Sequence, residues 1–163
     1  MDKNMTVSDR EIGFNMIDKL DKFICGYTFG FDAKANQLDI KSAYESLDKL
    51  IEENSTDTIV LAIKAMQETP QSTYINYTGD ETPSIKEVKA CINYIHAKGL
   101  KVILKPMVNV SNGTWRGHIC FFREDVPGEP TWGQWFKSYT QYMVAYAKLA
   151  EELCTIADQL NIS

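Results

Sequence analysis

The feature that most constrains this chain is the uninterrupted apolar run Thr58–Ile63, which is rich in β-branched residues. β-Branched side chains favour the extended backbone of a strand. A strand with one solvent-exposed face alternates between polar and apolar residues, whereas a strand buried on both faces has an uninterrupted run of apolar residues. The run therefore predicts a strand buried on both faces, as in a parallel sheet.

Two further apolar runs, Phe23–Phe29 and Lys101–Leu104, predict strands on either side of this one in the chain. Each of the three is followed by apolar residues at helical spacing. These are Ile40, Ala43, Leu47, Leu50 and Ile51; then Ile85, Val88, Ile92 and Ile95; and then Trp135, Phe136, Tyr139, Met143, Tyr146, Leu149, Ala150 and Leu153. Three βα units in succession predict an α/β fold with parallel strands and right-handed crossovers.

Local signals predict where two of the helices begin and end. Thr82–Ser84 starts the middle helix with a proline in its first turn, and Gly99 ends it. Thr131 and Gln134 have the spacing of a capping box at the start of the last helix. That helix is expected to run to about Leu160, with a break allowed near residues 154–155.

A short amphipathic helix is expected before the first strand, at Ser8–Lys22. We therefore divide the chain into a helical extension, residues 1–22, and one βα domain, residues 23–163. The beginning of the chain has no apolar run of the kind found in secretory signals. We accordingly expect a cytoplasmic protein with reduced cysteines, no membrane span and no membrane partner.

Charge and cysteine spacing exclude several classes of function. The formal net charge of -5 argues against nucleic acid as a partner, since phosphate binding needs a basic surface. No Cys-x-x-Cys pair is present, which excludes zinc ribbons and thioredoxin-type motifs. His118 and Cys120 are better explained by packing within a loop than by metal binding, so we expect no metal and no cofactor.

Ligands of parallel α/β folds bind beyond the carboxyl ends of the strands. Here these ends lead into segments 29–39, 67–82 and 108–130, and the last is longer than an ordinary connection. Sugars are recognised by flat aromatic faces and by polar groups that bond hydroxyls. The residues that offer both, and that we take as candidates for substrate binding, are Gln67, Lys105, Asn109, Trp115 and Arg116.

A structural explanation of two of these candidates is equally open from composition alone. Trp115 could pack the loop onto the rim of the fold, and Arg116 could pair with Glu124 or Asp125. Glu68, a single carboxylate after the second strand, is more often an ion-pair partner than an acid catalyst.

Four sequence blocks, in order, resemble glycoside hydrolase family 113, whose members are retaining, β-mannanase-type (β/α)₈ enzymes. They are Gln67-Glu68-Thr69-Pro70-Gln71-Ser72-Thr73; His96-Ala97-Lys98-Gly99-Leu100-Lys101-Val102-Ile103-Leu104-Lys105-Pro106; Gly113-Thr114-Trp115-Arg116-Gly117; and Trp135-Phe136-x-Ser138-Tyr139. The resemblance covers about residues 23 to 152. It implies a partial (β/α)₈ barrel of about three βα units, with carbohydrate as the partner.

The resemblance also implies catalytic glutamates on the fourth and seventh strands, and neither maps onto a residue of this chain. A full barrel needs about 250 residues. We therefore expect the N-terminal part of a glycoside hydrolase that acts on a β-mannan-like substrate, with this chain inactive alone. The alternatives are a non-catalytic carbohydrate-binding or self-associating half-barrel module, and a small doubly wound domain with an unrelated ligand.

Strands in the order 1-2-3 leave one unpaired edge on each outer strand, and exposed apolar edges promote association. With only three of the eight strands of a closed barrel, apolar side chains should also lose cover on one face or the other. We expect this of Ile24, Ile59, Leu61, Val102 and Leu104. The sequence therefore predicts a homo-oligomer joined through strand edges or through the open barrel face.

Overall fold

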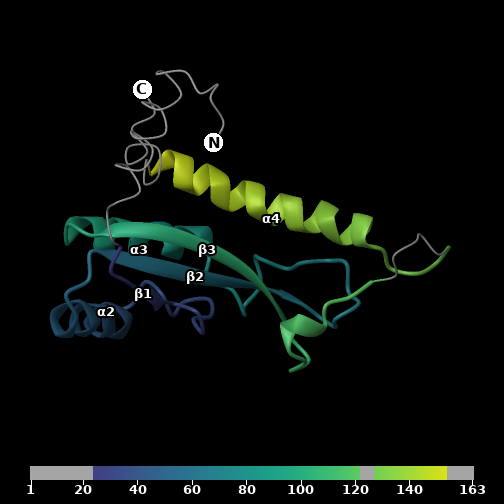
Figure 1. Ribbon diagram of the computed structural model, residues 1–163, viewed down its shortest axis with the longest axis horizontal. Helices are drawn as coiled ribbons and strands as arrows, with labels where there is room; N and C mark the ends of the chain where they lie inside the picture. The colour runs from purple at the N-terminus through teal and green to yellow at the C-terminus, as the bar shows by residue number, and fades with distance from the viewer. Residues whose placement is uncertain (1–23, 122–126, 154–163) are drawn as a thin grey trace, which may run out of the picture.

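A computed structural model describes residues 24–121 and 127–153 of the chain. The elements along the chain are β1 (Gly26–Phe29), α2 (Lys41–Glu53), β2 (Thr58–Gln67), α3 (Ile85–Ala97), β3 (Lys101–Val110), the 3₁₀ turn η1 (Arg116–His118) and α4 (Trp132–Glu152) (Figure 1). The alternation of strand and helix is confirmed. The helix expected at Ser8–Lys22, and any extension of α4 toward Leu160, lie outside the described residues.

The three strands form one parallel sheet in the order β1-β2-β3, as the apolar runs predict. The register pairs Gly26 with Thr58 and Thr58 with Lys101, and the second ladder continues to Gln67 opposite Val110. Both β2 and β3 are therefore longer than their apolar runs, which stop at Ile63 and Leu104. Lys64 ends one run and Lys105 the other, yet the backbone ladder continues past both.

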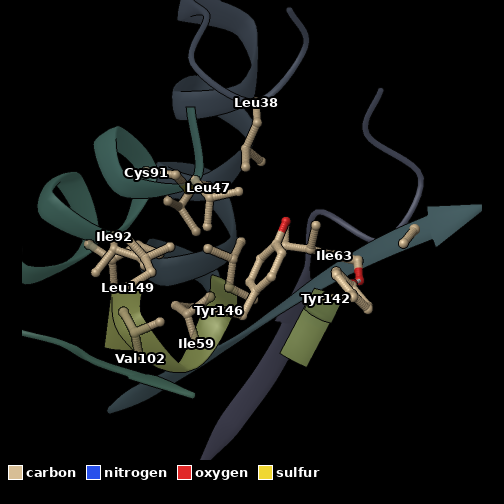
Figure 2. Packing of buried hydrophobic residues seen from close by; sticks show 14 of the residues in the cluster. Leu38, Leu47, Ile59, Ile63, Cys91, Ile92, Val102, Tyr142, Tyr146 and Leu149 are labelled. Atoms are coloured by element: carbon tan, nitrogen blue, oxygen red, sulfur yellow. Dashed lines mark hydrogen bonds between the residues drawn. The ribbon is translucent and has the colours of Figure 1, made fainter. Parts of the chain in front are cut away.

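The helices pack on one face of the sheet, and this packing makes the hydrophobic core (Figure 2). Odd-numbered residues of β2 and even-numbered residues of β3 point to that face. The buried members include Leu47 of α2, Ile59, Leu61 and Ile63 of β2, Val88, Ile92 and Ile95 of α3, Val102 of β3, and Tyr142, Tyr146 and Leu149 of α4. Figure 1 shows α4 running alongside β3, with α3 behind the strands.

The burial pattern corrects the list of side chains expected to be uncovered. Ile59 and Leu61 are fully buried, Val102 is almost so and Leu104 is partly buried against the core, because all four face the helices. Ile24 is exposed as expected, and Ile103 on the opposite face is exposed instead of its neighbours. The register assigns that opposite, inner face to Thr28 of β1, to Val60, Ala62, Lys64 and Met66 of β2, and to Ile103, Lys105, Met107 and Asn109 of β3.

Helix α3 is capped at both ends. Ser84 is the N-cap, and its side chain forms a capping box with Glu87. Pro83 thus precedes the helix rather than lying in its first turn, because the Ser84 hydroxyl bonds the Glu87 amide. At the other end the N–H groups of Gly99 and Leu100 bond back into the last turn, and Gly99 has a φ of 78°. A left-handed residue after the last turn favours glycine, so the predicted stop at Gly99 is confirmed.

Helix α4 begins with the predicted capping box. Thr131 Oγ1 accepts from the Gln134 amide, and Gln134 Oε1 accepts from the Thr131 amide. Further along the same helix, the Tyr142 ring is fully buried and its hydroxyl reaches between two strands. The hydroxyl donates to the Ile63 carbonyl of β2 at 2.9 Å and accepts from the Met107 amide of β3 at 3.1 Å. Tyr142 therefore joins α4 to both strands at once.

No described helix is long and apolar enough to cross a lipid bilayer.

Candidate functional site

The two faces of the sheet separate the residues that the sequence proposes for ligand binding. Lys105 and Asn109 lie four residues apart on β3, so both project from its inner face. Lys105 is exposed and Asn109 is half-buried. Gln67 ends β2 on the helix side of the sheet instead.

Gln67 is 1% exposed, and its amide is fully engaged within the protein. Its Nε2 donates to the Thr69 carbonyl at 2.8 Å, and its Oε1 accepts from Trp135 Nε1 at 2.8 Å. The side chain thereby joins the end of β2 to the loop that follows and to α4. This geometry suits a residue that positions the β2–α3 loop.

Trp115 stands out from the third loop, with 69% of its surface exposed. Its ring and that of His118 are nearly perpendicular, with centroids 5.7 Å apart. Gly117 lies directly under the indole, where a Cβ would come within 2.3 Å of the ring. The absence of a side chain at Gly117 therefore lets the Trp115 ring lie in this position, with much of its face open.

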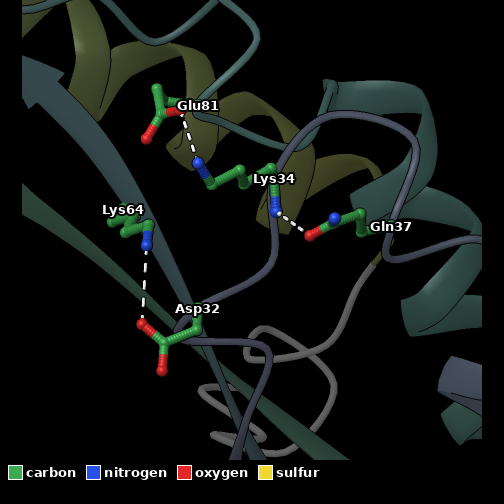
Figure 3. Close-up of polar contacts among 5 residues, drawn as sticks. All are labelled: Asp32, Lys34, Gln37, Lys64 and Glu81. Carbon is green, nitrogen blue, oxygen red and sulfur yellow. Dashed lines mark hydrogen bonds and ion pairs between the residues drawn. The ribbon is translucent and has the colours of Figure 1, made fainter.

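Arg116 and Lys64 both approach the ring of Phe31, which follows β1. The Arg116 guanidinium carbon lies 5.4 Å from the ring centroid, and Lys64 Nζ lies 5.7 Å from it. Such contacts stabilise a cation over the negative face of an aromatic ring. Lys64 Nζ also lies 3.5 Å from a carboxylate oxygen of Asp32 (Figure 3). We refer to Phe31, Asp32, Lys64 and Arg116 as the Phe31 cluster.

Sequence reasoning missed Phe31, Asp32 and Lys64. The Lys64 side chain is only 10% exposed, whereas that of Asp32 is 89% exposed, so a nearly buried cation meets a well-solvated carboxylate. One signal was available, because Lys64 interrupts an apolar segment and a buried charge has to be paired. The alternative pairing of Arg116 with Glu124 or Asp125 involves residues outside the described part of the chain.

An ion pair connects the loops that follow β1 and β2. Lys34 Nζ lies 2.7 Å from Glu81 Oε1, and the Lys34 amide donates to Gln37 Oε1 (Figure 3). The hydrogen bond from Lys34 lowers the pKa of the Glu81 carboxyl. A backbone bond from the Ala35 amide to the Asp80 carbonyl, at 3.0 Å, reinforces the link. These contacts therefore join the two loops to each other above the strand ends.

The chemistry available at the strand ends and on the inner face of the sheet is that of hydrogen bonding and stacking. Lys64, Lys105 and Arg116 offer donors, Asn109 offers both a donor and an acceptor, and Trp115 offers an aromatic face. Within residues 24–121 and 127–153, no group of three His, Cys, Asp or Glu side chains could hold a metal ion. Glu68 is exposed and forms no ion pair with any described residue.

Known proteins resemble this chain in sequence and in fold. The family model of glycoside hydrolase family 113 matches residues 27–157. Two solved structures of a β-1,4-mannanase of that family, one of them a complex, are each 44% identical, with a TM-score of 0.77. Each match covers 79% of this chain and 42% of the solved chain.

A third solved structure is the family 113 β-mannanase AaManA from Alicyclobacillus acidocaldarius, in complex with ManMIm. It is 35% identical, with a TM-score of 0.73, and the match covers 81% of this chain and 42% of that one. The chain thus spans less than half the length of these enzymes. No curated protein matches its sequence.

Proposed function

The chain belongs to glycoside hydrolase family 113, and from this premise we propose that it forms the N-terminal part of a β-mannanase-type hydrolase. Its strand ends then supply one wall of a binding site for a β-linked, mannan-like polysaccharide. The sheet is a segment of a (β/α)₈ barrel, and such barrels carry their active sites at the carboxyl ends of the strands.

The observation that carries this proposal is the set of residues at those strand ends and on the inner face that leads to them. Lys105 and Asn109 project from the inner face of β3, and Arg116 is held over Phe31. Trp115 presents an exposed ring beside them in sequence. An aromatic face together with several hydroxyl-bonding groups suits a neutral carbohydrate.

We propose that Gln67 serves this site indirectly. Its amide is engaged by Thr69 and Trp135, so its contribution is to hold the β2–α3 loop in place. The four residues that we assign to direct sugar contact are Lys105, Asn109, Trp115 and Arg116.

Titration of the purified chain with β-1,4-mannotetraose, followed by amide chemical shifts, tests the binding site. We expect weak binding in the millimolar range, because only part of the enclosing wall is present. Shifts should centre on Asn109, Trp115 and Arg116, and Arg116→Gln should weaken them. Lys49→Gln, a change of the same charge on the exposed surface of α2, should leave them as they are. A titration with no shift in residues 109–116 would refute this assignment.

We also propose that the chain alone does not hydrolyse glycosides. Retaining hydrolysis uses two carboxyl groups about 5–5.5 Å apart, one as nucleophile and one as acid and base. The family resemblance assigns both to later strands, and Glu68 cannot take both roles. Turnover of mannan or of an aryl β-mannoside by the purified chain, abolished by Glu68→Gln, would contradict this.

A second candidate role, self-association, is favoured by the open edges of the sheet. Within the described residues, β1 and β3 each pair on one side only. Ile24 and Ile103 are 57% and 39% exposed near those edges. Unpaired edges with apolar neighbours favour pairing with another copy, and two-fold dimers are the commonest oligomers. Light scattering after size exclusion decides, and a single species of 18.5 kDa at micromolar concentration would exclude the dimer.

A further inference from the structure

A cleft of about 510 Å³ lies at the carboxyl ends of β2 and β3, under the loop that joins β2 to α3. Met66 and Ser111 lie at its strand side, and the loop residues between Glu68 and Thr82 supply most of the rest. Its volume is within the range of about 300–1,000 Å³ that is usual for small-molecule sites. No lining residue belongs to the Phe31 cluster or to the four residues assigned above to sugar contact, so this is a separate site.

The walls of the cleft are held by contacts to neighbouring elements. Met66 and Asn76 exchange two backbone hydrogen bonds, at 2.9 and 2.7 Å, which fold the loop back onto the end of β2. The Ile75 amide donates to Ser138 Oγ of α4 at 2.8 Å, and the Ile75 side chain is buried. Glu81 is held by its ion pair with Lys34 of the β1–α2 loop. A preformed cleft lowers the entropy that binding has to overcome.

One buried hydroxyl in the lining has no partner. Thr82 is 2% exposed, and its Oγ1 forms no hydrogen bond with any described residue. Buried polar groups are nearly always bonded, so an unpaired one that lines a cleft is a place where a hydroxyl group or a water molecule can bond. A hydroxyl both donates and accepts, which matches the hydroxyl groups of a sugar.

The remaining lining chemistry also fits a neutral sugar. The Tyr74 ring is 69% exposed and offers a flat face for the C–H surface of a hexose. The carboxylates of Glu68 and Asp80 form no ion pair with described residues, and they can accept hydrogen bonds from hydroxyl groups. Glu81 is the third carboxylate, and Lys34 compensates its charge. The net negative charge left in the cleft disfavours uronates and phosphates.

We infer that this cleft, the β2–α3 cleft, is a saccharide subsite that holds a neutral hexose unit of the polysaccharide, next to the wall formed by β3 and its loop. The inference rests on the proposed function for its substrate class. In it Tyr74 stacks on the sugar ring, Thr82 Oγ1 bonds one hydroxyl, and the carboxylates of Glu68 and Asp80 accept from others. Because those carboxylates repel a second anion, the subsite discriminates against acidic sugars.

Titration of the full chain with β-1,4-mannotetraose, observed at the amides of residues 72–82, tests the subsite. We expect saturable shifts at Tyr74 and Thr82. Loss of stacking in Tyr74→Ala should weaken binding at these amides by about two- to tenfold, whereas Tyr74→Phe, which keeps the ring, should change it little.

The sharpest variant is Thr82→Val, which keeps the shape of the side chain and removes the unpaired hydroxyl. It should raise the melting temperature or leave it unchanged, and it should weaken sugar binding in the cleft. Unchanged affinity in Thr82→Val, as judged at residues 72–82, would overturn the assignment. A β-1,4-linked tetramannuronate is the matched acidic probe, and it should bind at least about tenfold more weakly.

The assignments of the two sites can be refuted independently of each other. Shifts at residues 109–116 without shifts at residues 72–82 would refute the subsite and leave the proposed wall intact. Shifts confined to residues 72–82 would support the subsite and refute the wall. Equal binding of tetramannuronate and mannotetraose at residues 72–82 would refute the proposed charge selection, and with it the subsite as stated.

Discussion

Replacing Tyr142 by Phe removes a single oxygen atom but should destabilise the chain clearly, because that atom forms hydrogen bonds with two strands. The hydroxyl stands between the Ile63 carbonyl and the Met107 amide, at 2.9 and 3.1 Å. Burial is the main reason that the pKa of this phenol lies well above its ordinary value, so the group stays protonated and able to donate. In Tyr142→Phe both backbone groups lose this partner inside the core.

The expected loss follows from the cost of a buried polar group without a partner, about 1–3 kcal/mol in the free energy of unfolding. For a chain of this length, that is a fall in melting temperature of about 2–12 °C. Urea denaturation followed by circular dichroism measures the loss as a lower midpoint with an unchanged slope.

Tyr146→Phe is the matched control on the same helix. The Tyr146 ring is also buried, but its hydroxyl forms no hydrogen bond with any described residue. Its removal should therefore be neutral or stabilising by up to about 1 kcal/mol. The two variants remove the same atom from buried tyrosines, so they should separate clearly. If both variants change the free energy of unfolding by less than about 0.5 kcal/mol, the backbone groups of β2 and β3 do not depend on the Tyr142 hydroxyl, and the prediction is wrong.

Three further outcomes are expected. Burial opposes ionisation of Glu87, but hydrogen bonds at the start of α3 outweigh it and lower the pKa of its carboxyl, so its contribution to stability is present above the unfolded pKa of about 4.3 and is lost as the pH falls through the lower folded pKa. Urea denaturation should therefore show Glu87→Gln to be less stable than wild type at pH 7, with a difference that shrinks in acid. A constant difference from pH 7 to 3 would contradict this. Burial raises the pKa of the Cys91 thiol to about 12, so iodoacetamide at pH 8 should label exposed Cys120 well before Cys91, as mass spectrometry of native protein would show. Gly117→Ala should displace the Trp115 ring and change its fluorescence while the melting temperature moves by less than about 2 °C, since that ring is mostly exposed; an unchanged spectrum would count against the contact.

The order of elements and the helix ends could be predicted because their causes are local. The apolar run at Thr58–Ile63, the capping pair Thr131 and Gln134, and the glycine at position 99 each act over a few residues. The lengths of the strands could not be predicted in the same way. A lysine after an apolar run resembles the end of a strand, and only the pairing of β2 with β3 shows that the ladder continues through Lys64.

The candidate site was predicted in part for a related reason. Lys105 and Asn109 share a face because they lie on one strand, a relation that sequence spacing contains once the strand is known. Gln67 was assigned to a loop, and the register places it on the helix side of the sheet instead. The contacts of Phe31 with Lys64 and Arg116 join three separate segments, and only the parallel order of the strands brings them together.

The alternation of faces along β2 has a consequence for how this sequence can change over evolutionary time. Ile59, Leu61 and Ile63 meet the helices, where selection acts on how much folded protein is present. Lys64 lies between such positions, points the other way and contacts Phe31 and Asp32, so a substitution there acts on contacts outside the core. Adjacent codons of one strand are therefore under different constraints, because a change at Lys64 alters the contacts with Phe31 and Asp32 while Ile63 still packs against the helices.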